Sequence, residues 1–285
     1  MFLVSTKNCT NAAIEISNKA DLHFIMTEVK RFPDEELYVR IVESGKGSEV
    51  IAIGNTTEDS EALEFVLLLN ALRENGASKV IAFLPYFGYA RQHMIYKPGE
   101  AISSMVLTEI LSKYSDEILT INIHDNSTMK YSEKKFRVIS MVKPLAKYFS
   151  GNDIGMVIAP DDGAMQLAEE AGKVLHVESR HLDKKRIDSI TVSYSEAKFN
   201  VAGKNILLID DIISTGGTIK KSIKILREMG ANKIYVGAIH GIFINNSGDD
   251  IAGICDELAV TDTIYSRYSK IKISDSIEEI MSEVV

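Results

Sequence analysis

Two adjacent carboxylates and a run of hydroxyls and glycines give this 285-residue chain its clearest chemical signature. Asp210 and Asp211 follow the apolar run 206–209, and residues 214–218 read Ser-Thr-Gly-Gly-Thr. Glycines let a backbone approach an anion closely, hydroxyls donate to it, and a helix N-terminus adds positive potential. Paired acids would repel a lone phosphate, so they indicate bound Mg²⁺ or the vicinal hydroxyls of a sugar. A phosphorylated sugar satisfies both halves.

The carboxylates and the hydroxyl and glycine run are expected to be positioned by the end of a strand. The run 206–209 is typical of a strand buried on both faces of a parallel sheet, and a helical pattern begins near Ile219. Ligands bind beyond the carboxyl ends of such strands, where we expect the acids to lie. The alternative for any one feature alone is an Asp-capped turn followed by an ordinary helix start. Further strands are expected at 118–123, 156–159 and 174–177, the last after a helix at 165–171.

Composition narrows the class of protein. The net charge of −8, from 32 basic and 40 acidic residues, argues against a surface that coats nucleic acid. No apolar run approaches the ~20 residues of a membrane helix. Only Cys9 and Cys255 occur, which fits a reducing cytoplasm without a disulfide framework. We therefore expect a cytoplasmic protein with neither nucleic-acid nor membrane partners.

An internal duplication predicts two domains. Six residues of 72–79 recur in 226–233 at a constant offset of 154 (226 minus 72), and in both copies a helix, a glycine and a buried strand follow in the same order. We expect two tandem α/β domains, 1–143 and 144–285, each a mainly parallel sheet flanked by helices. A helical tail from 273 should pack on one of them, the first domain being a candidate. Only the second copy carries the acids and glycines, so one sugar-phosphate site is expected per chain.

The stretch 205–221 resembles the phosphoribosyl-diphosphate loop of type I phosphoribosyltransferases and of ribose-phosphate diphosphokinases. At least five motifs follow in the order of the diphosphokinases, over nearly the whole chain. The resemblance implies two type I phosphoribosyltransferase-like domains. It also implies Mg²⁺-dependent transfer of the diphosphoryl group of ATP to the anomeric hydroxyl of ribose 5-phosphate. The products would be 5-phosphoribosyl 1-diphosphate, which feeds nucleotide biosynthesis, and AMP.

The resemblance assigns an ATP side to the first domain. By itself 31–36 reads as a solvated acidic turn, but in the diphosphokinases a phenylalanine with two nearby carboxylates contacts adenine. Tyr-Ala-Arg-Gln at 89–92 is similar to the loop that holds ATP in that family. Tyr96 stands where many members have a charged residue, which leaves the adenine-side contacts open. The implied ATP-binding residues are Phe32, Asp34, Glu36, Arg91 and Gln92.

Metal, charge and sugar roles follow from the same resemblance. His124 after one strand and Asp161 in a Pro-Asp-x-Gly loop match Mg²⁺ ligands, while the role of Asp125 stays open. Lys184 and Arg186 fit a Lys-x-Arg pair on a mobile loop that stabilises transition-state charge, with Lys185 as the alternative if the register slips. Many members have a third aspartate where this chain has Ser214. The implied ribose 5-phosphate residues are Asp210, Asp211, Ser214, Thr215, Gly216, Gly217 and Thr218.

The chain is also expected to form an oligomer. Because adenine and sugar groups lie in different domains, and a neighbouring subunit completes the ATP pocket in the family, we expect a homodimer at least, with a larger ring as the alternative.

Two other functions compete with the diphosphokinase reaction. One rival is an ordinary phosphoribosyltransferase, which would consume phosphoribosyl diphosphate with a nucleobase. The other is a non-catalytic homologue. The sequence leaves open regulation by ADP or phosphate, the range of nucleotides accepted, and the size of the oligomer.

Overall fold

The computed structural model describes residues 1–43, 45–182, 184–186, 192–194 and 199–284, with the backbone alone for 184–186, 192–194 and 283–284. The chain folds into two compact units, 1–140 with 273–285, and 141–272. The division lies beside α4 (Val142–Tyr148), near the boundary expected after residue 143. No helix within the described ranges is long and apolar enough to cross a membrane.

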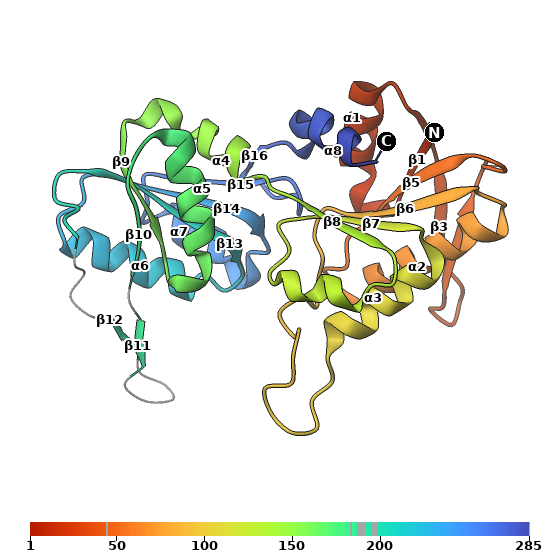
Figure 1. Ribbon diagram of the computed structural model, residues 1–285, viewed down its shortest axis with the longest axis horizontal. Helices are drawn as coiled ribbons and strands as arrows, with labels where there is room; N and C mark the ends of the chain where they lie inside the picture. Colours follow the sequence, from red (N-terminus) through yellow and green to blue (C-terminus); the bar gives the residue numbers. More distant parts are fainter. Residues whose placement is uncertain (44, 183, 187–191, 195–198, 285) are drawn as a thin grey trace. The chain divides into compact units, whose positions relative to one another are not determined.

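The first unit is built on a parallel sheet of six strands in the order β2-β1-β5-β6-β7-β8. In Figure 1, α1 and α8 lie on one face of this sheet and α2 and α3 on the other. Its core joins buried strand residues such as Val80 to the α2 residues Phe65 and Leu69, all fully buried. The bounds are β1 (Phe2–Ser5), β2 (His23–Ile25), β5 (Glu49–Ile53), β6 (Lys79–Leu84), β7 (Glu117–Ile121), β8 (Lys135–Ile139), α1 (Thr10–Ala20), α2 (Asp59–Glu74) and α3 (Ser103–Tyr114).

The chain's last segment belongs to this first unit. A short turn, η6 (Ile273–Ser276), and α8 (Ile277–Val284) pack on α1, and α8 also contacts β8. Lys19 forms an ion pair with Asp275, and the Ser274 hydroxyl donates to Glu15 Oε2 over 3.2 Å. Glu15 and Lys19 are four residues apart, so they share one face of α1. That face is the docking surface for the tail.

The second unit repeats the plan with a parallel sheet of order β10-β9-β13-β14-β15-β16. Its core joins strand residues such as Leu208 and Val236 to Ile223 and Leu226 of α6. The bounds are β9 (Ile154–Ala159), β10 (Ser179–His181), β13 (Asn205–Ile213), β14 (Ile234–Gly241), β15 (Glu257–Thr261), β16 (Ser269–Ile271), α5 (Met165–Leu175), α6 (Gly217–Glu228) and α7 (Ser247–Ala252).

The strand expected at 174–177 is wrong. Residues 174 and 175 form the last turn of α5, which ends where His176 adopts a left-handed conformation with φ 58°. The buried residues Ala168, Ala171 and Gly172 follow helical spacing, so the apolar pair at 174–175 continues that helix instead of starting a strand. The strand that follows is β10, which begins at Ser179.

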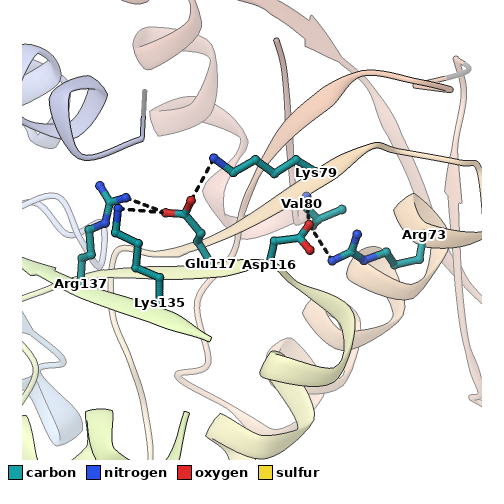
Figure 2. A network of polar contacts seen from close by, with 7 residues as sticks. All are labelled: Arg73, Lys79, Val80, Asp116, Glu117, Lys135 and Arg137. Carbon is teal, nitrogen blue, oxygen red and sulfur yellow. Dashed lines mark hydrogen bonds and ion pairs between the residues drawn. The ribbon is translucent and has the colours of Figure 1, made fainter. Parts of the chain in front are cut away.

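The duplicated joint folds in the same way in both units. Gly76 and Gly230 have φ values of 79° and 85°, the left-handed geometry that lets a glycine end a helix. Arg73 then reaches Asp116 Oδ2 at 2.7 Å, and the same oxygen accepts from the Val80 N–H at 2.8 Å (Figure 2). In the second unit Arg227 lies 2.6 Å from Asp256 Oδ2, which accepts from the Ile234 N–H at 2.8 Å. The internal repeat is therefore structural.

Candidate active site

The twin acids lie inside the extended end of β13. This strand pairs with β9 only as far as Leu208 opposite Ile158, but with β14 as far as Ile213 opposite Gly241. The sequence predicted the acids just past the strand. The structure instead carries the strand through them, because β14 continues alongside after β9 has ended. Asp210 and Asp211 thus have a neighbouring strand on one side only.

Three carboxylates gather at this strand end. The Asp211 N–H donates to Asp210 Oδ1 at 3.0 Å, and the Ile212 N–H donates to Asp211 Oδ1 at 2.7 Å. Burial, together with the negative charges of Asp211 and Asp161, raises the pKa of Asp210 well above that of an ordinary carboxyl group. The structure therefore brings the predicted metal ligand Asp161 close to the predicted sugar ligands. A cation or a set of sugar hydroxyls would stabilise the ionised form of Asp210.

The Asp161 loop supplies the third carboxylate from the end of β9. Asp161 precedes the short turn η4 (Asp162–Ala164), and its Oδ1 accepts from the Gly163 N–H at 3.1 Å. Among the residues that the structure describes, no three His, Cys, Asp or Glu side chains are placed to hold a metal ion together. Mg²⁺ sites in enzymes commonly use one or two carboxylates with substrate oxygens and water, so these acids still fit that metal.

The loop 214–216 leads from β13 into α6 and is shaped by contacts to its carbonyl groups. The Ser214 carbonyl accepts from the Ser247 hydroxyl at 2.7 Å and from the Ile244 N–H at 3.0 Å. Gly216 has φ 71°, and a Cβ there would lie 2.8 Å from Cδ1 of Ile251. Both observations tie the loop to the segment around α7.

The N-terminus of α6 has no side-chain cap, because its N-cap residue is Gly216. The N–H groups of the first helical turn have no partner within a helix, and the helix dipole adds positive potential there. The hydroxyls of Thr215 and Thr218 flank the same turn. This arrangement can bind a phosphate group next to the acids of β13.

The predicted basic pair lies in a strand whose side chains are outside the described residues. Lys184 and Arg186 belong to β11 (Lys184–Arg186), which pairs antiparallel with β12 (Val192–Tyr194). The register places Lys184 opposite Tyr194 and Arg186 opposite Val192. The roles of Lys184 and Arg186, and the alternative Lys185, stay predictions.

In the first unit the predicted adenine loop is the turn of a hairpin between β3 (Thr27–Arg31) and β4 (Leu37–Ile41). Phe32 is 46% exposed, and its ring meets Tyr38 edge-on with centroids 5.7 Å apart. The Phe32 N–H donates to the Glu36 carbonyl at 2.9 Å, and the Glu36 N–H donates to Asp34 Oδ1 at 3.4 Å. The turn thus presents an exposed aromatic ring with two exposed carboxylates beside it.

The segment after β6 is tied to the loop after β5. The N–H of Tyr86 donates to Asn55 Oδ1 and that of Gly88 to Thr56 Oγ1, each at 2.8 Å. A Cβ on Gly88 would lie 1.9 Å from the Thr56 carbonyl oxygen, so only glycine fits there. Arg91 follows on this anchored segment and is exposed. No carboxylate of the described residues forms an ion pair with it, so its guanidinium is available to a phosphate.

The Gln92 side chain is bound within its own loop. Its amide donates to the Met94 carbonyl at 2.9 Å and to Glu100 Oε2 at 3.2 Å. The same Glu100 oxygen accepts from the N–H groups of Lys97 at 2.9 Å and Tyr96 at 2.8 Å, and these bonds lower the pKa of Glu100. No sequence motif marks Glu100 as the residue that organises this loop. The ATP contact predicted for Gln92 stays a prediction.

The predicted metal ligand His124 follows β7 and is exposed. It belongs to the first unit, whereas Asp161 belongs to the second. Its neighbour Asp125 accepts from the Ser127 N–H at 2.7 Å and lies 3.3 Å from His93 Nε2. Sequence reasoning left Asp125 open and did not single out His93.

Known proteins agree with this architecture. The chain is 41% identical to a ribose-phosphate pyrophosphokinase of Thermoplasma volcanium, over 96% of each chain. It belongs to the ribose-phosphate pyrophosphokinase family. A family relative of Pyrococcus furiosus is 40% identical over 91% of this chain and 92% of its own. Residues 1–114 match the N-terminal domain of ribose phosphate pyrophosphokinase, and 134–249 match the phosphoribosyl transferase domain.

A solved structure supports the fold. A phosphoribosylpyrophosphate synthetase from Mycobacterium smegmatis superposes with a TM-score of 0.87 over 99% of both chains, at 23% identity. Both units are thus type I phosphoribosyltransferase-like domains. The predictions of the family, of the fold and of an enzyme are confirmed.

Proposed function

We propose that this chain transfers the diphosphoryl group of ATP to ribose 5-phosphate, giving 5-phosphoribosyl 1-diphosphate and AMP for nucleotide biosynthesis. The observation that carries the proposal is the pair Asp210 and Asp211 beside the uncapped N-terminus of α6. An anion site next to hydroxyl acceptors suits a phosphorylated pentose. Relatives that match almost the whole chain are named ribose-phosphate pyrophosphokinases, which supports the same reaction.

In the proposed reaction the anomeric oxygen attacks the β-phosphorus of ATP in line. A bond forms between these two atoms, and the bond from the β-phosphorus to the α–β bridging oxygen breaks, so that oxygen leaves with AMP and the anomeric proton passes to solvent. Asp210 and Asp211 would hold the ribose hydroxyls, directly or through Mg²⁺. Such a transfer depends on positioning and charge neutralisation, because the protein forms no covalent bond. The phosphate end is held by Ser214, Thr215, Gly216, Gly217 and Thr218.

Mg²⁺ is part of the proposal. The carboxylates around Asp210 suit a hard cation, since burial and neighbouring acids already disfavour the ionised form of that residue. His124 and Asp161 are the proposed ligands. When bound, the ion would neutralise the triphosphate and polarise its oxygens.

The nucleotide side is assigned on the first unit. Phe32 would stack on adenine, with Asp34 and Glu36 accepting from its exocyclic amine, and Arg91 and Gln92 would hold the phosphates. The exposure of Phe32 and of Arg91 supports these roles. Lys184 and Arg186 would stabilise developing charge on the transferred group. We further propose a homodimer at least, in which a neighbouring subunit completes the ATP pocket, acting in the cytoplasm.

The test is AMP release from ATP and ribose 5-phosphate with Mg²⁺. The wild type should produce AMP and phosphoribosyl diphosphate in equal amounts, and Asp210→Ala with Asp211→Ala should abolish turnover and ribose 5-phosphate binding. Glu278→Ala with Glu279→Ala is the matched control, because it removes two adjacent exposed acids from α8. Unchanged turnover in the Asp210 and Asp211 variant refutes the assignment. Consumption of phosphoribosyl diphosphate with a nucleobase, without AMP from ATP, favours the phosphoribosyltransferase rival.

A further inference from the structure

A histidine and an aspartate join the two loops that flank the proposed nucleotide site. His93 lies two residues after Arg91 on the loop that follows β6, and Asp125 lies next to His124 after β7. Nε2 of His93 and Oδ2 of Asp125 are 3.3 Å apart. The His93 side chain is 13% exposed and that of Asp125 is 35% exposed, so water screens this contact less than it screens a surface pair.

Neighbouring groups fix the orientation of the His93 ring. The Tyr131 hydroxyl donates to the His93 carbonyl at 3.0 Å, and the Tyr96 ring meets the imidazole edge-on with centroids 5.8 Å apart. The Tyr96 hydroxyl lies 3.4 Å from Nε2. Nδ1 is buried without a hydrogen-bond partner among the described residues. All polar contact of the ring therefore passes through Nε2, which can donate to the carboxylate when it carries the hydrogen.

Asp125 divides its two oxygens between two loops. Oδ1 accepts from the Ser127 N–H at 2.7 Å, which caps the short turn η2 (Asn126–Tyr131), and Oδ2 faces His93. One carboxylate thus joins the loop of Arg91 to the turn that follows His124.

We propose that His93 and Asp125 are positioning residues for the nucleotide, which set the spacing between Arg91 and His124. The inference rests on the proposed function, in which those two residues hold the triphosphate and its metal. The start and the end of the loop have anchors of their own, Thr56 at Gly88 and Glu100 at Lys97. The His93 contact, with the Tyr131 bond to the His93 carbonyl, joins the part between them to the segment after β7. Catalytic groups lose much of their effect when displaced by about 1 Å, so a contact that fixes their separation affects ATP and spares ribose 5-phosphate.

The test compares MgATP and ribose 5-phosphate binding by calorimetry, because this measurement does not depend on turnover. His93→Leu and Asp125→Ala should each weaken MgATP binding about tenfold. The double variant should bind MgATP no more weakly than the weaker-binding of the two single variants, because the two residues act through one contact. Binding of ribose 5-phosphate should be unchanged. His93→Gln keeps an N–H donor near the position of Nε2, so it should restore most of the MgATP affinity that His93→Leu loses.

The control is a histidine and carboxylate pair elsewhere in the same unit. His23 and Glu43 are 2.9 Å apart, but both side chains are more than half exposed, and His23→Leu should leave both affinities unchanged. Losses that multiply in the double variant, or a matching loss of ribose 5-phosphate binding, overturn the inference. If His93→Leu does not fold, His93→Gln takes its place in the test. The inference is then overturned if His93→Gln binds MgATP as weakly as Asp125→Ala does. A wild type that binds both ligands without releasing AMP refutes the proposed reaction alone, whereas one that binds no nucleotide overturns both.

Discussion

The N–H of Gly88 donates to Oγ1 of Thr56 over 2.8 Å, and both groups are buried. Thr56 lies in the loop between β5 and α2, which corresponds to the loop between β13 and α6 in the second unit. In the first unit this loop therefore binds the chain's own backbone and supports the segment that leads to Arg91. Its counterpart in the second unit leads into the N-terminus of α6, where we propose that the phosphate binds.

The first prediction concerns this support. Thr56→Val keeps the shape of the side chain but leaves the buried Gly88 N–H without an acceptor, which should lower the free energy of unfolding by about 1–3 kcal/mol. Urea denaturation measures the change. Thr56→Ser retains the hydroxyl and should lose less than Thr56→Val. A loss in Thr56→Ser as large as that in Thr56→Val would contradict this prediction, because the methyl group would then contribute as much as the hydrogen bond.

Two adjacent glycines at the start of α6 should respond differently to alanine. Gly216 has φ 71° and little room beside Ile251, so Gly216→Ala should lower the free energy of unfolding by more than about 1 kcal/mol. At Gly217 the nearest atom to an added Cβ is Thr215 Oγ1 at 3.9 Å, and alanine favours a helix. Gly217→Ala should therefore fold at least as stably as the wild type. Thermal unfolding of the two variants side by side decides the point, and equal melting temperatures would contradict it.

The sequence predicted the buried parts of the fold well, because they have a local signature. The apolar runs at 80–84 and 234–238 are strands, and the glycines that end the preceding helices take the same conformation. Strand ends were harder to predict. The extension of β13 depends on its pairing with β14, which lies far away in the sequence. The apolar pair at 174–175 is compatible with a helix as well as with a strand.

Long-range polar contacts left no local pattern. His93 and Asp125 are 32 residues apart (125 minus 93), and Glu100 binds its loop through groups that no motif marks. A lone histidine or glutamate in a polar loop is most often an ordinary solvated residue. Its role becomes clear only when the structure shows which residue it contacts. The acids and glycines of the second unit were found because their chemistry lies in one short stretch of sequence.

A cluster at the start of three strands of the first unit gives a prediction of stability (Figure 2). Glu117 lies 2.9 Å from Lys79 Nζ and 2.8 Å from an Arg137 nitrogen, with Lys135 at 4.0 Å. The Glu117 and Arg137 side chains are only 15% and 17% exposed. Glu117→Gln removes the carboxylate that balances these cations and should cost about 2 kcal/mol, less than for a fully buried pair because water still reaches the lysines.

Glu28 provides the matched control for Glu117. It also contacts two cations, Lys30 at 3.0 Å and Arg40 at 3.4 Å, but all three side chains are well exposed. Glu28→Gln should therefore leave the urea midpoint unchanged, because salt and water screen such contacts. If both variants lose the same stability, the low exposure of the Glu117 cluster is not what makes it important.

The last prediction uses the raised pKa of Asp210. Because the folded state binds this proton more tightly than the unfolded state, the wild type should lose stability as the pH rises from the ordinary carboxyl value of about 4 through the raised pKa. Asp210→Asn has no such proton to lose, so its melting temperature should exceed that of the wild type by a margin that grows over this range and then levels off. A margin for Asp210→Asn that shrinks with rising pH would mean that the folded protein favours the ionised carboxylate, and the acids of β13 would then need no cation or sugar hydroxyl beside them.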